Sequence, residues 1–217
     1  MPKEALAKIP LFSGLGEGEL ESLARGAVVR SFPRQSVLIN EGDDSDALYV
    51  IFSGQLKVFL SDEQGREIVL NQMGEGEYFG ELALLDDTPR SASVMVVEAC
   101  KVAIISRAVF DKVLDEHVGM ARKLLAGLSK RLRMATDNIR SLALLDVYGR
   151  VARLLIDAAA EEEGRFITPK MTQQDMADRV GSSREMVSRI LKDLRAGDYI
   201  TMEGKRIIIE RALPERW

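Results

Sequence analysis

Four residues in the middle of the chain are suited to binding a phosphorylated sugar. Gly80 and Glu81 are followed, a short way along the chain, by Arg90 and Ser91. An arginine and a hydroxyl can hold a phosphate, a carboxylate can accept a hydrogen bond from a sugar hydroxyl, and glycine lets the backbone approach a ligand closely. The helical turn expected at 81–85 would also offer backbone N–H groups to an anion. On this chemistry alone, a nucleotide site and a β-turn with incidental charges both stay open.

A second group of polar residues has the spacing of a helix-turn-helix. Thr172 can cap a first helix, Gly181 can form the turn, and Ser182 or Ser183 can cap a second helix. The second helix would bury an apolar stripe and expose base-reading side chains on its other face. The stripe is Val187, Ile190, Leu191 and Leu194, and the exposed residues are Arg184, Glu185, Ser188 and Arg189.

The exposed residues of this second helix have the chemistry of base recognition. Arginine can donate two hydrogen bonds to guanine, and glutamate can accept one from cytosine. The alternative is an ordinary helical hairpin with surface charges. The glycine turn, the serine caps and the clustered base-reading side chains together favour DNA binding over that alternative.

The phosphate-binding residues lie within a β-rich region that extends to about residue 107. Short runs of β-forming residues alternate there with turn signals, after a helix expected at 17–25. Many short strands at this spacing predict a sandwich or barrel. The expected strands are 36–40, 47–51, 55–60, 67–71, 93–97 and 101–105.

Residues 108–145 are helical in pattern and carry one narrow apolar seam. The seam residues follow one another at spacings of 3, 4, 3, 4 and 3, and they are Leu125, Leu128, Leu132, Ala135, Ile139 and Leu142. A helix packed on its own domain would also have an apolar face. The narrow and regular seam favours a parallel homodimer instead.

Residues 146–217 are expected to form a third unit. Asp146 can cap a helix at 147–160, and strands at 200–203 and 206–210 would make a wing with Lys205 and Arg206 near its turn. From residue 165 onward the chain has eleven Lys or Arg against eight Asp or Glu, although the whole chain has a formal charge of −4. This mild excess does not by itself establish nucleic-acid binding.

Taken in order, these segments resemble the cyclic AMP receptor protein (CRP/FNR) family of transcription regulators. Residues 74–94, with Gly80-Glu81 and Pro89-Arg90-Ser91-Ala92, resemble the phosphate-binding cassette of cyclic-nucleotide-binding domains, and 38–54 resemble the glycine-flanked hairpin of those domains. Residues 145–152 and 181–191 resemble the family's hinge and helix-turn-helix. The resemblance implies an α+β fold: an N-terminal cyclic-nucleotide-binding β-barrel of jelly-roll type (1–107), a dimerisation helix and hinge (108–145), and a C-terminal winged helix-turn-helix (146–217).

The resemblance also implies a role for each matching position. Cyclic AMP is the first choice of ligand, and it would be held by Gly80, Glu81, Leu82, Arg90, Ser91, Ala92, Arg131 and Thr136. DNA half-sites similar to TGTGA would be bound by Thr172, Gln174, Ser183, Arg184, Glu185, Ser188, Arg189 and Lys205. The implied partners are double-stranded DNA, a second copy of the chain and RNA polymerase.

Two positions depart from the family's pattern. Where the receptor protein places a Thr-Ser pair against the adenine, the aligned residues are Ala135 and Thr136, so cyclic GMP, cyclic di-GMP or action without a ligand stay open as alternatives. In the recognition helix, Met186 replaces a phosphate-binding threonine.

The composition argues against an enzyme and against a metal-based or haem-based sensor. The chain has one histidine, His117, and one cysteine, Cys100, and it lacks metal-ligand spacings and a Walker-type loop. A nucleotide-binding subunit that controls a protein partner would not need a recognition helix. With no long apolar run and no signal peptide, the sequence predicts a cytoplasmic regulator that is not an enzyme, binds no metal and spans no membrane.

Overall fold

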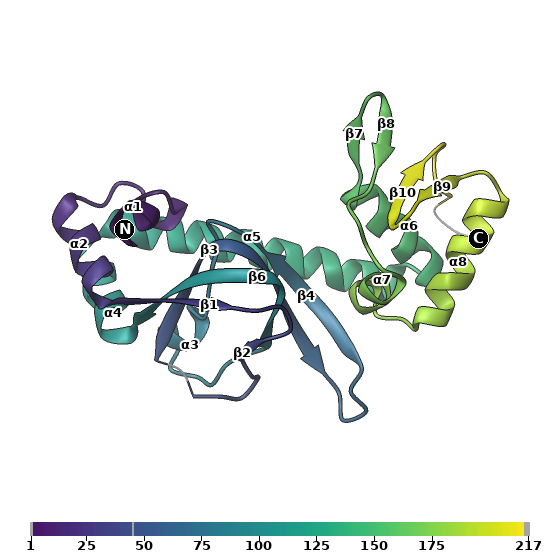
Figure 1. Ribbon diagram of the computed structural model, residues 1–217. Coiled ribbons are helices and arrows are strands. Elements are labelled where there is room, and N and C mark those ends of the chain that lie inside the picture. The colour runs from purple at the N-terminus through teal and green to yellow at the C-terminus, as the bar shows by residue number, and fades with distance from the viewer. Residues whose placement is uncertain (1, 45, 215–217) are drawn as a thin grey trace. The chain divides into compact units, whose positions relative to one another are not determined.

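The computed structural model describes residues 2–44 and 46–214. The chain divides into two compact units (Figure 1). The first unit contains the residues up to 60 together with 70–133, and the second contains 61–69 together with the residues from 134 onward. The expected β-rich N-terminal region, helical middle and C-terminal winged helix-turn-helix are all present.

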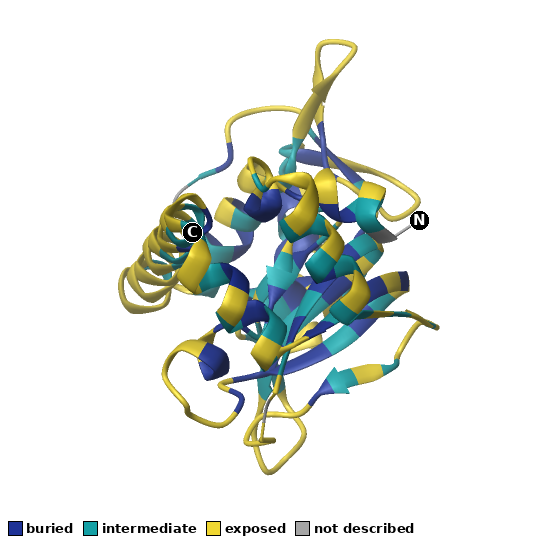
Figure 2. Cartoon of the chain, turned by 90° about the vertical axis from the view of Figure 1, so that its left-hand side faces the viewer, coloured by how far each residue is buried: buried dark blue, intermediate teal, exposed yellow. Residues whose placement is uncertain are grey.

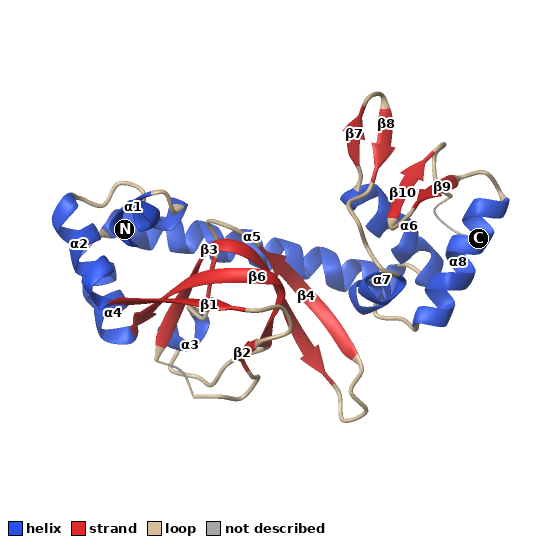
Figure 3. Cartoon of the chain, viewed as in Figure 1, coloured by secondary structure: helices blue, strands red, loops and turns tan. Residues whose placement is uncertain are grey.

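The first unit is built on a six-stranded sheet with strand order β1-β6-β3-β4. In this sheet β2 pairs with β6, and β5 pairs with β3 (Figure 3). The pairs of β6 with β1, β2 and β3 are antiparallel. The strands are β1 (Ala27–Phe32), β2 (Val37–Ile39), β3 (Ala47–Ser61), β4 (Glu67–Met73), β5 (Tyr78–Phe79) and β6 (Ser93–Ser106).

Two of these strands are longer than the sequence indicates. The runs at 47–51 and 55–60 were predicted as separate strands but form the single strand β3, and 93–97 and 101–105 form the single strand β6. The register between β3 and β6 shifts between Ile51 and Leu56. Residues 52–54, which separate the two predicted strands, therefore form an irregular part of one continuous strand. Gly54 has a φ of +92°, and a Cβ atom there would lie 2.4 Å from the carbonyl oxygen of Ala99. The two strands can approach this closely because the residue is glycine.

Helices cover the first unit and share its core. They are α1 (Pro2–Ala7), the 3-10 helix η1 (Pro10–Phe12), α2 (Glu17–Gly26), α3 (Leu82–Leu85), α4 (Arg107–Glu116) and the first part of α5 (Val118–Leu144). The helix expected at 17–25 is confirmed as α2. His117 has extended backbone angles and separates α4 from α5, so α4 is a helix of its own. Phe110 and Val113 of α4 are buried with Met120 and Leu124 of α5.

The second unit has its own core beneath a four-stranded sheet of order β7-β8-β10-β9. Its helices carry buried residues on one side and exposed residues on the other. The helices of the first unit, which face the viewer in Figure 2, have the same pattern. The elements of the second unit are α6 (Val147–Ala158), β7 (Ala160–Glu162), β8 (Arg165–Ile167), α7 (Gln173–Val180), α8 (Arg184–Ala196), β9 (Ile200–Glu203) and β10 (Arg206–Ile209). The side chain of Asp146 accepts a hydrogen bond from the Gly149 amide at 2.7 Å, which confirms the predicted cap of α6.

The predicted end of α6 is wrong by two residues, because residues 160–167 form a hairpin that the sequence analysis missed. Strands β7 and β8 pair with Glu162 opposite Arg165, which leaves the two-residue turn Glu163-Gly164. Both turn residues have positive φ, 50° for Glu163 and 77° for Gly164, as tight hairpin turns require. The run of glutamates is typical of the exposed end of a helix, but here it forms a strand and its turn.

Candidate nucleotide pocket and DNA-binding surface

Glu81 is a buried carboxylate at the start of α3. It is 1% exposed, and its Oε1 atom is paired with the Arg131 guanidinium. Its Oε2 atom is buried and has no hydrogen-bond partner in the part of the chain that the structure describes. Since buried polar atoms are normally hydrogen-bonded, this oxygen is placed to accept a donor from a ligand. A sugar hydroxyl has the chemistry that it needs.

Arg131 ties the helix α5 to this segment. Its guanidinium donates to Glu81 Oε1 and to the carbonyl oxygen of Tyr78, and it lies 4.9 Å from the centre of the Tyr78 ring. The Tyr78 hydroxyl lies against Gly127 of α5, where a Cβ atom would be 2.4 Å from it. Burial raises the pKa of Tyr78, so the phenol is neutral at physiological pH. Arg131 and Gly127 therefore place α5 directly against the predicted ribose-binding carboxylate.

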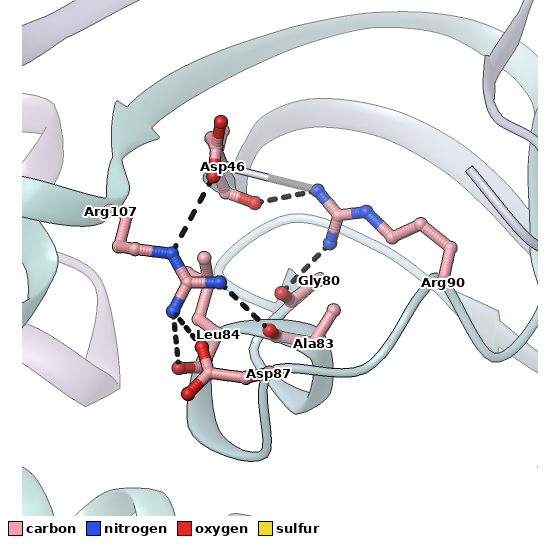
Figure 4. A network of polar contacts seen from close by, with 8 residues as sticks. Asp46, Gly80, Ala83, Leu84, Asp87, Arg90 and Arg107 are labelled. Atoms are coloured by element: carbon pink, nitrogen blue, oxygen red, sulfur yellow. Dashed lines mark hydrogen bonds and ion pairs between the residues drawn. The ribbon is translucent and has the colours of Figure 1, made fainter. Parts of the chain in front are cut away.

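Arg90 is buried beside the same segment. It is 7% exposed, and its Nη1 and Nη2 atoms each donate at 2.8 Å, to the carbonyl oxygens of Gly80 and Ala47 (Figure 4). Burial lowers the pKa of the Arg90 guanidinium from its ordinary value, partly offset by Tyr49, Glu81 and Asp43. A guanidinium has five N–H donors, so these two contacts leave Arg90 with donors for a phosphate while fixing its direction.

A cavity of about 170 Å³ opens next to Arg90. Among the described residues that line it, Arg90 is the one cation, and three aspartates lie on the neighbouring loop. The lining residues are Leu38, Ile39, Asp43, Asp44, Asp46, Ala47, Tyr49 and Arg90. Gly80, Glu81 and Ser91 are not among these lining residues, so the cavity adjoins Arg90 and does not include the Glu81 carboxylate.

Gly80 should be essential to this arrangement. Its φ is +85°, and a Cβ atom there would lie 2.2 Å from Arg90 Nη1. We expect Gly80→Ala to displace the Arg90 guanidinium, to lower the free energy of unfolding by ~1–3 kcal/mol, and to weaken nucleotide binding about 10-fold. Chemical denaturation and calorimetric titration measure the two effects.

The matched control for this variant is Gly65→Ala. Gly65 also has a positive φ of 75°, but a Cβ atom there meets nothing within 4 Å. It should reproduce the backbone strain without the loss of affinity. Equal affinity in Gly80→Ala and the unaltered chain would contradict the assigned role of Gly80.

The other residues predicted to contact the ligand are Leu82, Ser91, Ala92 and Thr136, and most of them are exposed. Leu82 is an exposed residue in the first position of α3, and the exposed Ser91 and buried Ala92 directly precede β6. Thr136 is exposed on the part of α5 that belongs to the second unit. The structure thus brings Gly80, Glu81, Arg90 and Arg131 into direct contact with one another or with shared partners. Sequence reasoning missed the supporting residues Tyr78, Ala47, Asp87 and Arg107, because no motif singles them out.

The helix-turn-helix is built by local capping, as the sequence predicts. Thr172 caps α7 and accepts a hydrogen bond from the Asp175 amide at 3.1 Å, while the Asp175 carboxylate accepts from the Thr172 amide. Gly181 ends α7 with a φ of +63°, and Ser183 Oγ accepts from the Met186 amide at the start of α8. The predicted apolar stripe of α8 is buried. These contacts confirm the predicted helix boundaries.

The predicted base-reading residues lie on the outer face of α8. Arg184, Glu185 and Arg189 are exposed, and Ser188 is half-buried. Lys205 is exposed in the turn of the β9–β10 wing, while Gln174 donates from Nε2 to Asp178 at 2.7 Å. The side chains predicted to contact DNA therefore include exposed ones at the start of α8 and in the wing turn.

Two arginines of the second unit have structural contacts. Arg206, expected near the wing turn as a phosphate contact, pairs with Glu162 of β7 and donates to the carbonyl oxygen of Thr168. Arg150 of α6 donates to the carbonyl oxygens of Val180 at 2.8 Å and Leu145 at 2.9 Å. Arg150 thereby fixes the turn that precedes the recognition helix to the end of α5.

Comparison with known proteins agrees with this arrangement. Residues 29–117 match the cyclic nucleotide-binding domain, and residues 149–212 match the Crp-like helix-turn-helix domain. The cAMP-activated global transcriptional regulator CRP of Escherichia coli is 35% identical over 188 residues, which cover 83% of this chain and 89% of the relative. The chain belongs to the CRP/FNR family.

Other members of the CRP/FNR family are similar over most of the chain. The CRP-like cAMP-activated global transcriptional regulator of Mycobacterium tuberculosis is 32% identical over 211 residues, covering 95% of this chain and 94% of the relative. The solved structure of the c-di-GMP responsive global regulator CLP of Xanthomonas campestris is similar with a TM-score of 0.77 and 29% identity. That match covers 89% of this chain and 99% of the CLP chain.

The family and the predicted α+β fold are therefore both confirmed, and the chain is a CRP-family transcription regulator with a cyclic-nucleotide-binding domain. Within residues 2–44 and 46–214, no helix has the length and apolarity needed to cross a membrane. No cluster of three or more His, Cys, Asp or Glu in those ranges could hold a metal ion.

Proposed function

We propose that this protein is a cAMP-activated dimeric regulator that binds palindromic DNA with TGTGA-like half-sites. The observation that carries the proposal is that two groups of opposite charge in one short segment, Glu81 and Arg90, are both buried. Glu81 Oε2 has no hydrogen-bond partner among the described residues, and Arg90 has donors to spare. One group suits a ribose hydroxyl and the other a cyclic phosphate, with Ser91 and Ala92 beside Arg90 in the chain.

The surroundings of Arg90 favour a ligand with one phosphate charge. Cyclic di-GMP carries two phosphates. Asp43, Asp44 and Asp46 line the cavity next to Arg90, and Asp46 also lies 3.6 Å from the Arg107 guanidinium. A second phosphate close to Asp43 and Asp44 would be repelled. The relatives named as cAMP-activated are also more similar in sequence than the cyclic di-GMP-responsive one. The choice of adenine over guanine depends on contacts from α5, for which Thr136 is our candidate.

The exposed seam of α5 supports a dimer. Leu125, Leu132 and Ile139 are 63%, 69% and 67% exposed in the single chain, and they repeat every seven residues. Such a row of exposed large apolar residues is typical of a helix that pairs with a second copy. We propose the division into a nucleotide-binding domain (1–107), a dimerisation helix and hinge (108–145) and a DNA-binding domain (146–217). The dimer would act in the cytoplasm with RNA polymerase as a further partner.

Ile139→Glu should disrupt this dimer. The substitution places two carboxylates close together across the two-fold axis and removes two apolar contacts, so we expect the dimer dissociation constant to rise at least about 10-fold. Sedimentation velocity over a range of protein concentrations measures it. Ile156→Glu is the control, because Ile156 is similarly exposed on α6 but lies outside the seam. An unchanged dimer in Ile139→Glu would contradict the proposed interface.

Calorimetric titration tests the proposed ligand. The full chain is titrated with cAMP, cyclic GMP and cyclic di-GMP, each with and without an operator duplex that contains two TGTGA-like half-sites. We expect cAMP to bind most tightly and to bind more tightly still with the operator present, because linkage makes the coupling reciprocal. Tighter binding of another cyclic nucleotide would contradict the choice of cAMP, and absence of binding by all three would contradict a nucleotide-controlled regulator.

A further inference from the structure

Arg107, the first residue of α4, joins three segments that lie next to Glu81 or Arg90 in the chain or in space (Figure 4). Its guanidinium donates at 3.0 Å to each of the carbonyl oxygens of Ala83 and Leu84, in α3. It also pairs with the Asp87 carboxylate at 2.8 Å and lies 3.6 Å from the Asp46 carboxylate. The Arg107 side chain thus contacts the end of α3, the turn after α3 at Asp87, and the loop that contains Asp46.

These contacts satisfy groups that a short helix leaves unpaired. The last carbonyl groups of a helix have no partner within it, and a cation near them is favourable. Arg107 supplies two donors and a positive charge at the end of α3, whose other end starts beside Glu81. The orientation of α3, and with it the position of Glu81, therefore depends on Arg107.

The loop opposite α3 is held by the same residue. The Arg107 amide donates to the Asp46 carbonyl oxygen at 2.7 Å, and the next residue, Ala47, accepts the hydrogen bond from Arg90 Nη2. Asp46 and Ala47 both line the cavity. Arg107 therefore fixes both the segment that carries the ribose-binding carboxylate and the segment that orients the phosphate-binding guanidinium.

Apolar packing connects this assembly to the long helices. Leu84 of α3 is buried in the same cluster as Phe110 of α4 and as Met120 and Leu124 of α5. Arg107 stands at the start of α4, three residues before Phe110. A movement of α3 would therefore also move α4 and α5, because α3 contacts α4 through Arg107 and shares a packed apolar cluster with both helices.

We propose that Arg107 is a positioning residue that couples occupancy of the nucleotide pocket to α4, and through α4 to α5. A phosphate on Arg90 and a sugar on Glu81 favour one position of α3 and of Asp46 and Ala47. In that position Arg107 also holds the start of α4. The bound ligand therefore favours one arrangement of α3, α4 and α5. The inference depends on the proposed function, because it takes the ligand to be a cyclic nucleotide.

The test measures coupling as well as affinity. In the full chain, cAMP affinity is measured by calorimetry, and operator affinity is measured with and without saturating cAMP. For Arg107→Gln we expect cAMP affinity to fall about 10-fold and the cAMP-dependent gain in operator affinity to fall about 10-fold.

Two further variants separate this role from a purely structural one. Arg107→Lys keeps the charge but not the planar fork that contacts two carbonyl groups and Asp87, so its values should lie between those of Arg107→Gln and the unaltered chain. In an Asp87→Asn background, Arg107→Gln should cost less than it does alone, because the two residues share a contact. Lys112→Gln removes a charge from an exposed position of the same helix and should change neither affinity nor coupling.

Each outcome decides the proposal. Reduced cAMP affinity and reduced coupling in Arg107→Gln, with intermediate values in Arg107→Lys, support it. A lower melting temperature with unchanged coupling would overturn it in favour of a structural role. If Arg107→Gln does not fold, the same two measurements, cAMP affinity and the cAMP-dependent gain in operator affinity, are made on Arg107→Lys and Asp87→Asn. A reduction of both supports the proposal, and unchanged coupling overturns it. A wild-type chain that binds no cyclic nucleotide would overturn the proposed function itself, before any variant is compared.

Discussion

Replacing Arg90 with Ala should weaken cAMP binding by about 100-fold, which corresponds to ~3 kcal/mol for a charge-assisted, bidentate phosphate contact. Arg90 is buried, and the carbonyl oxygens of Gly80 and Ala47 hold its guanidinium in one direction. A ligand phosphate thus meets a donor group whose conformational freedom has already been lost on folding. The alanine variant loses both the charge and this fixed geometry.

Calorimetric titration of the full chain checks this result. Arg90→Lys should restore only part of the affinity, because an ammonium group keeps the charge but lacks the fork. Arg30→Ala serves as the control, since Arg30 is exposed on β1. Chemical denaturation of each variant separates lost ligand contacts from lost folding. If Arg90→Ala binds cAMP as tightly as the unaltered chain, the pocket assignment is wrong.

Arg184→Ala should relax the sequence preference of DNA binding by ~1–3 kcal/mol at the base pair that Arg184 contacts. Arg184 is the first residue of α8, directly after the cap Ser183, and its side chain is exposed. The start of a recognition helix is the part that reaches base edges in the major groove. The expected loss concerns one operator position, with affinity for unrelated DNA nearly unchanged.

Lys205→Ala provides the contrasting variant. Lys205 lies in the wing turn, where a contact to phosphate carries no sequence information. Its loss should weaken binding to all sequences alike and should reduce the salt dependence of log affinity by about one unit. Fluorescence anisotropy with the operator, with single base-pair variants and with unrelated DNA at several salt concentrations distinguishes the two patterns. A uniform, salt-sensitive loss in Arg184→Ala would identify Arg184 as a phosphate contact instead.

The DNA-binding half was predictable because its signals are local. Thr172, Gly181 and Ser183 each form a cap or turn with residues close by in the chain, so their types indicate where α7 begins and ends and where α8 begins. The hairpin β7–β8 escaped prediction because its turn residue Glu163 adopts a positive φ that glutamate rarely has. The apparent break within β3 depended on partners distant in sequence, which periodicity does not reveal.

The sequence singles out Glu81 and Arg90 as candidate pocket residues, but it does not reveal the contacts that hold them. Glu81 and Arg90 stand out because glycine, carboxylate and arginine occur together in one segment. Their partners Arg131 and Ala47 lie 50 and 43 residues away. Such contacts arise from the folding of the sheet and from the placement of α5. Arg107 has no motif of its own, and its contacts alone give it a role.

The unpartnered oxygen of Glu81 has a consequence for which nucleotides this protein can accept. A ligand that donates a hydroxyl to Oε2 relieves a buried acceptor that otherwise costs ~1–3 kcal/mol. A 2′-deoxyribose has no hydroxyl at that position, and would leave the oxygen unpaired and shielded from water. We therefore expect the carboxylate to discriminate between sugars, so that a 2′-deoxy cyclic nucleotide binds more weakly than its ribose counterpart.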